Sequence, residues 1–414
     1  MADAASRRDE EAGGERVSSR SGKPGCGHAK LRAGCAVARK LNPNQKGNRR
    51  RVPLWKWVWN KGRGVSETIL FPFSILASLY GLSCRLRILL YEKGMLPRKK
   101  VDCLVVSIGN LTVGGTGKTP FTIFLAKKWQ ERGYTVGIVS RGYRGTYKGP
   151  LRLVSDGQEI LERPETAGDE PYLMAQRLKG IPILVSSDRY KGCQWLLERF
   201  HLDLILLDDG FQHIRLHRDL NILLVDATNP FGNGALLPRG ALREPLSEVR
   251  RADVVIFTRS EDQADASEWI GEIERFGKPC VRTSFQPSRL IDVRNGTALP
   301  AGTLVKEPVL SFCGIGNPDS FGMLLKRLGV DLREQVVFRD HHSYQLSDLE
   351  KIRKKADQLG AKWVVTTEKD AVKIKALLPK DFVVWALRVD IIFWEDPAKW
   401  ESLLFHSKPT LRSV

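Results

Sequence analysis

The chain has 414 residues, a hydrophobic fraction of 42% and a formal net charge of +19. At about 150 residues per domain, this length allows two or three domains with a substantial core. Residues 1–66 hold 16 basic and 5 acidic side chains, so more than half of the net charge lies in a short leader. The remaining body is ordinary in charge, and the sequence predicts no nucleic-acid partner. The seven cysteines form no CxxC pair, which excludes a disulfide framework.

Residues 1–50 are predicted to be a disordered, basic, transit-like leader outside the fold. Between Arg16 and Ser66 there are 14 Lys and Arg and no acidic side chain. This composition is typical of an organelle transit peptide, although the acidic run from Asp9 to Glu11 is atypical. A basic tail on a cytosolic protein is the alternative.

Residues 51–100 are predicted to form a membrane-associated helical segment. Three tryptophans between positions 55 and 59 precede an apolar run from Ile69 to Cys84, and cations follow it. Sixteen residues of helix cover about 24 Å, short of a hydrocarbon core of about 30 Å, and Pro72 interrupts the run. We therefore expect a helix lying in the bilayer interface rather than spanning it. A helix packed on the protein body is the alternative.

From Val101 onward, short apolar runs alternate with amphipathic stretches, which is typical of a parallel α/β fold. The strands expected in the first part are 104–108, 136–140, 183–185, 204–207, 222–225 and 254–258. The helices expected there are 118–132, 170–178, 189–200 and 262–276. Residues 101–285 are assigned to this core and 286–308, which are rich in proline, to a linker.

A second, smaller α/β domain is expected over residues 309–414. Its predicted strands are 309–312, 363–366 and 383–386, and its predicted helices are 318–328 and 347–359. The fold class is therefore α/β, with a parallel-sheet core containing a phosphate-binding loop, a C-terminal α/β domain and an N-terminal membrane-interface helix.

The first strand of the core is followed by GNLTVGGTGKTP, residues 109–120, and then by a helix. This is nearly the Walker A pattern in its strand-loop-helix context, with Thr112 where the strict pattern has glycine. Backbone N–H groups and the helix N-terminus would bind phosphate oxygens of ATP. Lys118 would reach the β and γ phosphates, and the Thr119 hydroxyl would bind Mg²⁺. The predicted nucleotide-binding residues are Thr112, Gly114, Gly115, Thr116, Gly117, Lys118 and Thr119.

An apolar strand over 204–207 is followed directly by Asp208 and Asp209. Ligands of open α/β sheets bind at the carboxyl ends of strands, and paired carboxylates suit a magnesium site. A simple turn is the alternative for these two residues. Gly168-Asp169-Glu170-Pro171 adds two carboxylates at a helix start, and Arg141 follows a strand in a turn suited to phosphate.

A phosphate loop is also compatible with a membrane-associated P-loop ATPase switch, and this is the alternative function that we consider. The signature lysine of that class would fall at Val113, and its absence argues against it. A GTPase needs an N-K-x-D motif, and the sequence Thr367-Glu-Lys-Asp370 does not supply it.

Eight motifs in order make the chain resemble the tetraacyldisaccharide 4′-kinase family of lipid A biosynthesis. They are IGNLTVGGTGKTP, VSRGY, GDEP, DDGFQH, LREP, GIGNP, DHHSY and TTEKDAVK, and the resemblance covers about residues 54–390. It implies a membrane-associated kinase that uses ATP and Mg²⁺. The acceptor would be the 4′-hydroxyl of a tetraacylated glucosamine disaccharide 1-phosphate, and the product lipid IVA. No protein partner is implied.

The resemblance also implies roles for individual residues. Asp169 would be the base toward the acceptor hydroxyl, oriented or tuned by His341. Arg243 would stabilise phosphate charge together with Lys118. The magnesium ligands would be Thr119, Glu170, Asp208 and Asp209, and the substrate or transfer site would include Asn110, Arg141 and Gln212. No role is assigned to His342 or to the TTEKD segment.

The transit-like leader differs from bacterial members of the family, which begin near the equivalent of Leu54. A mitochondrial enzyme, peripheral on the inner side of a membrane, is therefore expected. The cytoplasmic face of a bacterial-type inner membrane is the alternative.

Overall fold

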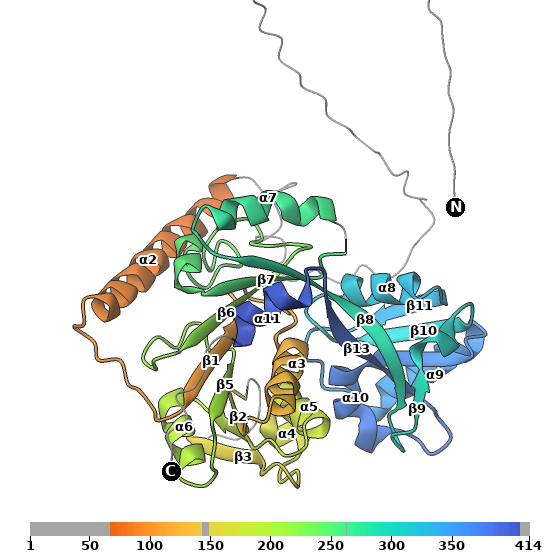
Figure 1. Ribbon diagram of the computed structural model, residues 1–414. Coiled ribbons are helices and arrows are strands. Elements are labelled where there is room, and N and C mark those ends of the chain that lie inside the picture. The colour runs from red at the N-terminus through yellow and green to blue at the C-terminus, as the bar shows by residue number, and fades with distance from the viewer. Residues whose placement is uncertain (1–66, 143–148, 262, 406–414) are drawn as a thin grey trace, which may run out of the picture. The chain divides into compact units, whose positions relative to one another are not determined.

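The computed structural model describes residues 67–142, 149–261 and 263–405. The predicted leader and the tryptophan-rich segment lie outside these ranges, as does Tyr143 of the VSRGY motif. The described strands form one 13-stranded sheet with the order β11-β10-β12-β13-β8-β7-β6-β1-β5-β2-β4-β3, and β9 pairs with β8 (Figure 1). The sheet confirms the predicted α/β class.

The N-terminal half of the sheet has a parallel core. Its strands are β1 (Leu104–Gly109), β2 (Val136–Ser140), β3 (Leu151–Ser155), β4 (Ile183–Ser186), β5 (Leu204–Asp208), β6 (Leu220–Asp226) and β7 (Val254–Thr258). All pair in parallel except β3, an antiparallel edge strand that the sequence analysis missed. Because helices cover both faces of the parallel strands, almost every residue of these strands is buried, which explains their continuous apolar runs.

Four helices of this half lie within a few residues of their predicted bounds. They are α3 (Lys118–Glu131), α5 (Asp169–Arg177), α6 (Arg189–Leu197) and α7 (Gln263–Glu274). The short helix α4 (Pro164–Ala167) and the 3₁₀ helix η1 (Leu246–Arg251), which precedes β7, were not predicted. Strand β1 lies between β5 and β6, with Ile108 paired to Asp208. The segments that follow β1, β2 and β5 therefore meet at one edge of the sheet.

The C-terminal half contains β10 (Pro308–Cys313), β11 (Asp331–Val337), β12 (Trp363–Thr367) and β13 (Trp385–Phe393). Its helices are α8 (Pro318–Arg327), α9 (Leu346–Gln358), α10 (Glu368–Ile374) and α11 (Pro397–Phe405), with η3 (Lys375–Leu377) after α10. Figure 1 shows α5 beside α10, and residues of these two helices are in contact. Strand β11 and helices α10 and α11 were not predicted.

Strand β8 (Cys280–Asp292) joins the two halves of the sheet. Its first residues pair in parallel with β7, and from Thr283 onward it pairs antiparallel with β13. Its second half, together with β9 (Ala298–Pro300) and η2 (Ala301–Leu304), occupies the range 286–308 in which the sequence predicts a linker. Regular structure therefore fills that range, and the division into two domains stays a prediction.

Helix α2 (Glu67–Glu92) has 26 residues and passes through Pro72, Arg85 and Arg87 without a break. At 1.5 Å per residue it is about 39 Å long, so the expectation of a segment too short to span a bilayer is wrong. By length and composition the segment Leu70–Glu92 could cross a membrane, and most of its apolar part is not buried. Leu70, Ala77 and Ile88 are among the residues that face the protein body. Seven large apolar side chains point outward: Phe71, Ile75, Leu76, Leu79, Leu82, Leu86 and Leu89.

Candidate active site

The phosphate loop connects β1 to α3 and is held from two sides. Val113 N–H donates to the carbonyl of Ala241 at 2.8 Å, and the Thr258 hydroxyl donates to the carbonyl of Thr116 at 3.0 Å. Gly117 caps α3 with φ 84°, and a Cβ there would lie 2.5 Å from the ring of Phe285 on β8. Only glycine fits this position, because both its conformation and the close ring exclude a side chain.

Two buried polar atoms of the loop segment make no hydrogen bond within the described part of the chain. They are the side-chain nitrogen of Asn110 and the hydroxyl of Thr116. Native structures pair nearly all buried polar groups, so unpaired donors next to a helix N-terminus are consistent with a phosphate-bearing ligand such as ATP. The ammonium of Lys118, on the first turn of α3, donates to Asn110 Oδ1 at 3.2 Å.

Asp209 lies after β5 in a left-handed conformation, with φ 55°. Arg243 Nη1 is 2.9 and 3.1 Å from its two carboxylate oxygens, and Lys118 Nζ is 3.6 Å from Oδ1. Burial alone would raise the pKa of Asp209, but these two cations outweigh it and lower that pKa to about 2. The structure thus brings together Lys118, Asp209 and Arg243, as expected from the motifs.

The neighbouring Asp208 has the opposite electrostatic environment. It is buried, and it accepts hydrogen bonds from the Ser140 hydroxyl at 3.0 Å and the Thr122 hydroxyl at 3.4 Å. Burial, followed by the charges of Glu170 and Asp209, raises the pKa of Asp208 to about 6. A cation among these three carboxylates would relieve their repulsion, so the residues fit Mg²⁺.

The described residues contain no three side chains of His, Cys, Asp or Glu arranged to hold a metal ion by themselves. This agrees with the usual chemistry of magnesium in phosphoryl-transfer sites. That ion binds through one or two carboxylates, and substrate phosphates and water complete its shell. Thr119, on the first turn of α3, is buried at the same edge of the sheet.

Asp169 is the first residue of α5, and the C-terminal half of the chain supplies its partner. His341 Nδ1 lies 3.1 Å from Asp169 Oδ2, and Lys373 Nζ lies 3.7 Å from the same oxygen. Burial would raise the pKa of Asp169, but the hydrogen bond from His341 and the charge of Lys373 outweigh it and lower that pKa. The next residue, Glu170, pairs with Lys369 at 3.0 Å. Burial would also raise the pKa of Glu170, but Lys369 and Lys118 lower it.

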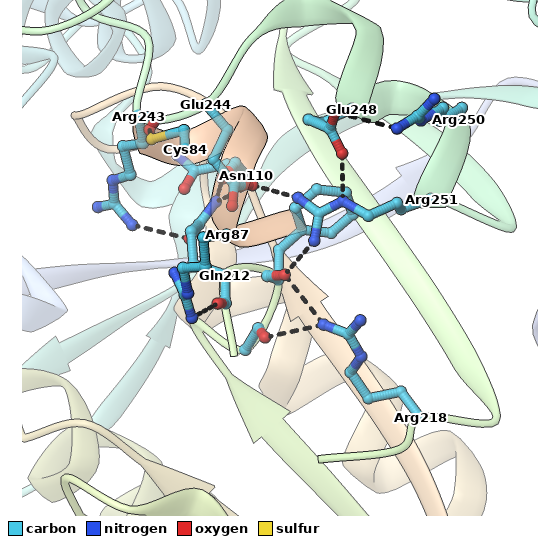
Figure 2. Close-up of polar contacts among 12 residues, drawn as sticks. Cys84, Arg87, Asn110, Gln212, Arg218, Arg243, Glu244, Glu248, Arg250 and Arg251 are labelled. Carbon is cyan, nitrogen blue, oxygen red and sulfur yellow. Dashed lines mark hydrogen bonds and ion pairs between the residues drawn. The ribbon is translucent and has the colours of Figure 1, made fainter. Parts of the chain in front are cut away.

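Figure 2 shows Gln212 between the phosphate loop, the Arg243 loop and helix α2. Its amide nitrogen donates to the carbonyl of Asn110 at 2.8 Å, and its amide oxygen is 3.5 Å from Arg243 Nη1. From α2, Arg87 donates to the carbonyl of Gln212 at 3.1 Å, and the Tyr80 hydroxyl donates to the carbonyl of Arg243 at 2.7 Å. The apolar helix therefore contacts Gln212 and the loop that carries Arg243 directly.

The GIGNP motif of the C-terminal half lies against the phosphate loop. A Cβ on Gly316 would lie 2.9 Å from the backbone nitrogen of Gly115. Asn317 Nδ2 is 3.3 Å from Asp226 Oδ2, at the end of β6. Arg141, another predicted site residue, follows β2 directly, and its side chain is exposed.

Sequence reasoning missed several residues at this site. Lys369 and Lys373 lie in the TTEKDAVK segment, to which no role was given, and contact Glu170 and Asp169. Their only signal in the sequence was membership of that motif. Arg189 is buried and donates to the carbonyl of Asp209 at 3.4 Å, and its type and position gave no indication of this contact.

His342 contacts residues other than the hydrogen-bonded pair of Asp169 and His341. Its ring stacks on Phe338 with centroids 4.6 Å apart, and Nε2 is 2.9 Å from Asp348 Oδ2 near the start of α9.

Comparisons with known proteins agree with this geometry. A family model described as tetraacyldisaccharide-1-P 4′-kinase matches residues 67–407. The tetraacyldisaccharide 4′-kinase of Syntrophus aciditrophicus is 40% identical over 336 residues, which cover 77% of this chain and 90% of that protein. The protein of the same name from Geobacter sulfurreducens is 40% identical over 332 residues, which cover 80% and 91%.

A solved structure of a similar protein also matches this chain. The crystal structure of LpxK from Aquifex aeolicus in complex with ATP is similar with a TM-score of 0.65 at 35% identity, and the match covers 82% of this chain and 98% of that one. The chain therefore belongs to the tetraacyldisaccharide 4′-kinase family.

Proposed function

We propose that the protein transfers the γ-phosphate of ATP to the 4′-hydroxyl of a tetraacylated glucosamine disaccharide 1-phosphate, at a membrane surface. The observation that carries this proposal is the convergence of two halves of the chain. The hydrogen-bonded pair Asp169 and His341 adjoins a phosphate loop whose lysine contacts Asp209. One half supplies groups for the nucleotide, and a histidine of the other orients a carboxylate.

Each of these residues has a role that follows from its charge. Lys118 and Arg243 would bind oxygens of the transferring phosphoryl group and stabilise the charge that develops there. Asp169, ionised because of its cationic neighbours, would accept the proton of the attacking hydroxyl. His341 would hold that carboxylate in place.

Magnesium would be held by the hydroxyl of Thr119 and by one or two of the carboxylates of Asp208, Asp209 and Glu170, with phosphate oxygens and water completing its shell. When bound, the ion neutralises charge on the phosphates. The chemistry of the candidate donors supports this assignment: all of them are oxygens, as Mg²⁺ requires, and the carboxylates repel one another without a cation.

The test is to incubate the purified protein in detergent with γ-labelled ATP and a tetraacyl disaccharide 1-phosphate. We expect a labelled lipid product, and expect Lys118→Ala to abolish its formation because electrostatic stabilisation is lost. ATP hydrolysis without a labelled lipid would favour the alternative, a membrane ATPase switch.

Association with a bilayer surface is supported by the outward apolar face of α2. Leu79 and Leu86 are 60% and 54% exposed. Burying one leucine stabilises by about 1.5–3 kcal/mol, so Leu79→Lys with Leu86→Lys should weaken vesicle binding by more than about tenfold. The matched control places the same two charges on the exposed Met323 and Leu346 of the C-terminal half. Equal vesicle binding by the two double variants would contradict the proposal.

A mitochondrial location stays a prediction that depends on residues outside the described ranges. The relatives compared above are bacterial and do not support it. The cytoplasmic face of a bacterial-type inner membrane is the location that agrees with those relatives.

A further inference from the structure

Lys369 contacts the Asp169 and His341 pair from a third element, helix α10. Its ammonium lies 3.1 Å from His341 Nε2 and 3.0 Å from Glu170 Oε1. The other ring nitrogen of the same histidine, Nδ1, lies 3.1 Å from Asp169 Oδ2. These contacts form a continuous chain from a lysine through an imidazole to a carboxylate. The side chains of Lys369 and His341 are both largely buried.

The direction of each hydrogen bond follows from the chemistry of the three groups. An ammonium carries donors only, so His341 Nε2 must be the acceptor and carries no proton. The single proton of the neutral ring is then on Nδ1, where it is donated to Asp169.

We propose that Lys369 is a positioning residue that fixes His341 in its neutral Nδ1–H tautomer, so that His341 can only donate to Asp169. The proposal rests on the function given above, in which Asp169 is the base. His341 then orients the carboxylate but does not take up the proton, and Asp169 alone receives it from the acceptor hydroxyl.

The backbone around Lys369 is held firmly. The side chain of Thr367 caps α10 by accepting from the Asp370 N–H, and the buried Asp370 carboxylate accepts from the Gly314 N–H at 2.9 Å. Arg177 of α5 pairs with Glu368 at 2.6 Å, which ties the helix that holds Asp169 to the helix that holds Lys369.

His341 is equally constrained. Its φ of 57° lies in the left-handed region, which a residue other than glycine adopts at a cost, and its N–H donates to the carbonyl of Gly314 at 3.0 Å. Gly314 thus contacts both segments, through Asp370 on one side and His341 on the other. Asp340 Oδ1 lies 3.9 Å from Nε2, which is beyond hydrogen-bond distance.

An ion pair with Glu170 could be the whole role of Lys369, and the test must separate the two roles. The full-length protein, with ¹⁵N in its histidine rings and without metal or nucleotide, is measured by long-range ¹H–¹⁵N NMR. The His341 signals are assigned by their loss in His341→Gln. We expect the Nδ1–H tautomer in the wild type and a shift toward the Nε2–H form in Lys369→Met.

Lys369→Arg provides the matched control, because a guanidinium also carries donors only and keeps the charge. We expect it to retain the tautomer and most of kcat. At saturating Mg²⁺, Lys369→Met should lower kcat by about 10- to 100-fold with little change in the KM for ATP.

An Nε2–H tautomer in the wild type would overturn the proposal without any variant. An unchanged tautomer in folded Lys369→Met would do the same. Failure of the base assignment would appear elsewhere, as a normal kcat in Asp169→Asn, and would leave the NMR result on His341 unaffected.

Discussion

The hydroxyl of Tyr80 donates a 2.7 Å hydrogen bond to the main-chain carbonyl of Arg243, the arginine that contacts Asp209. Burial raises the pKa of Tyr80 to about 12, which keeps the hydroxyl protonated as a donor. The outward-facing apolar helix is thus hydrogen-bonded directly to the loop that carries Arg243.

Tyr80→Phe should lower kcat by roughly fivefold, since a hydrogen bond of about 1 kcal/mol holds the Arg243 loop. The measurement is kcat with the acceptor in detergent, where bilayer binding plays no part. Tyr91→Phe makes the same change on the last turn of the same helix and should have no effect. Identical kcat values in the two variants would show that the contact does not position Arg243.

Asp169→Asn should lower kcat by roughly 10² to 10⁴ with the KM for ATP little changed, because an amide cannot accept the proton. A capping role does not account for Asp169, since the N-cap of α5 is Gly168 and no side chain caps that helix. If the carboxylate and His341 act as a unit, Asp169→Asn with His341→Gln should be scarcely worse than the poorer single variant. Additive losses would mean that the two residues act independently.

Metal affinity should depend on pH through Asp208. Its pKa of about 6 means that the carboxylate is protonated below that pH and must lose the proton to bind a cation. The apparent affinity for Mn²⁺, used as an EPR-visible substitute for Mg²⁺, should therefore be about tenfold weaker at pH 5 than at pH 7.5. Asp208→Asn should bind weakly at both pH values, and a dependence that persists in this variant would assign the titration to another group.

Arg251 should contribute strongly to stability. It pairs with Glu244 and, at 2.8 Å, with Glu248, and both carboxylates are buried (Figure 2). Arg251→Met removes the ion pair of the buried Glu244 and leaves the buried Glu248 with only its 3.6 Å contact to Arg250, so it should cost about 3–5 kcal/mol in the free energy of unfolding, measured by urea denaturation. Arg250→Met, next in the chain and 52% exposed, should cost less than about 1 kcal/mol. Comparable losses would show that Glu244 and Glu248 have other compensation.

The core of the fold could be predicted because its parallel strands are buried on both faces and read as continuous apolar runs. Strands β2 and β7 match their predicted bounds. Strand β11 contains only exposed and partly buried residues, and the second half of β13 alternates between these two classes, so both strands lack that signal and were missed or misplaced. The length of α2 was underestimated because the apolar run was ended at Cys84, before Arg85 and Arg87, although the helix continues through both to Glu92.

The candidate site likewise contains residues that could be predicted from the sequence and residues that could not. Lys118, Asp208 and Asp209 follow apolar strands at one sheet edge, so local pattern and topology were enough to group them. Lys369 lies 199 positions from Glu170, and no local pattern predicts that α10 meets α5. The tertiary structure alone makes this lysine part of the site.

The continuity of β8 limits how the protein can be divided. One strand hydrogen-bonds to β7 in its first residues and to β13 in the rest, and its Phe285 fills the space next to Gly117. An excised C-terminal half would lose the strand that covers the edge of β13, and an excised N-terminal half would lose the ring that packs on its phosphate loop. Chimeras that exchange halves between relatives should therefore be joined outside residues 280–292, with β8 and β13 taken from the same parent.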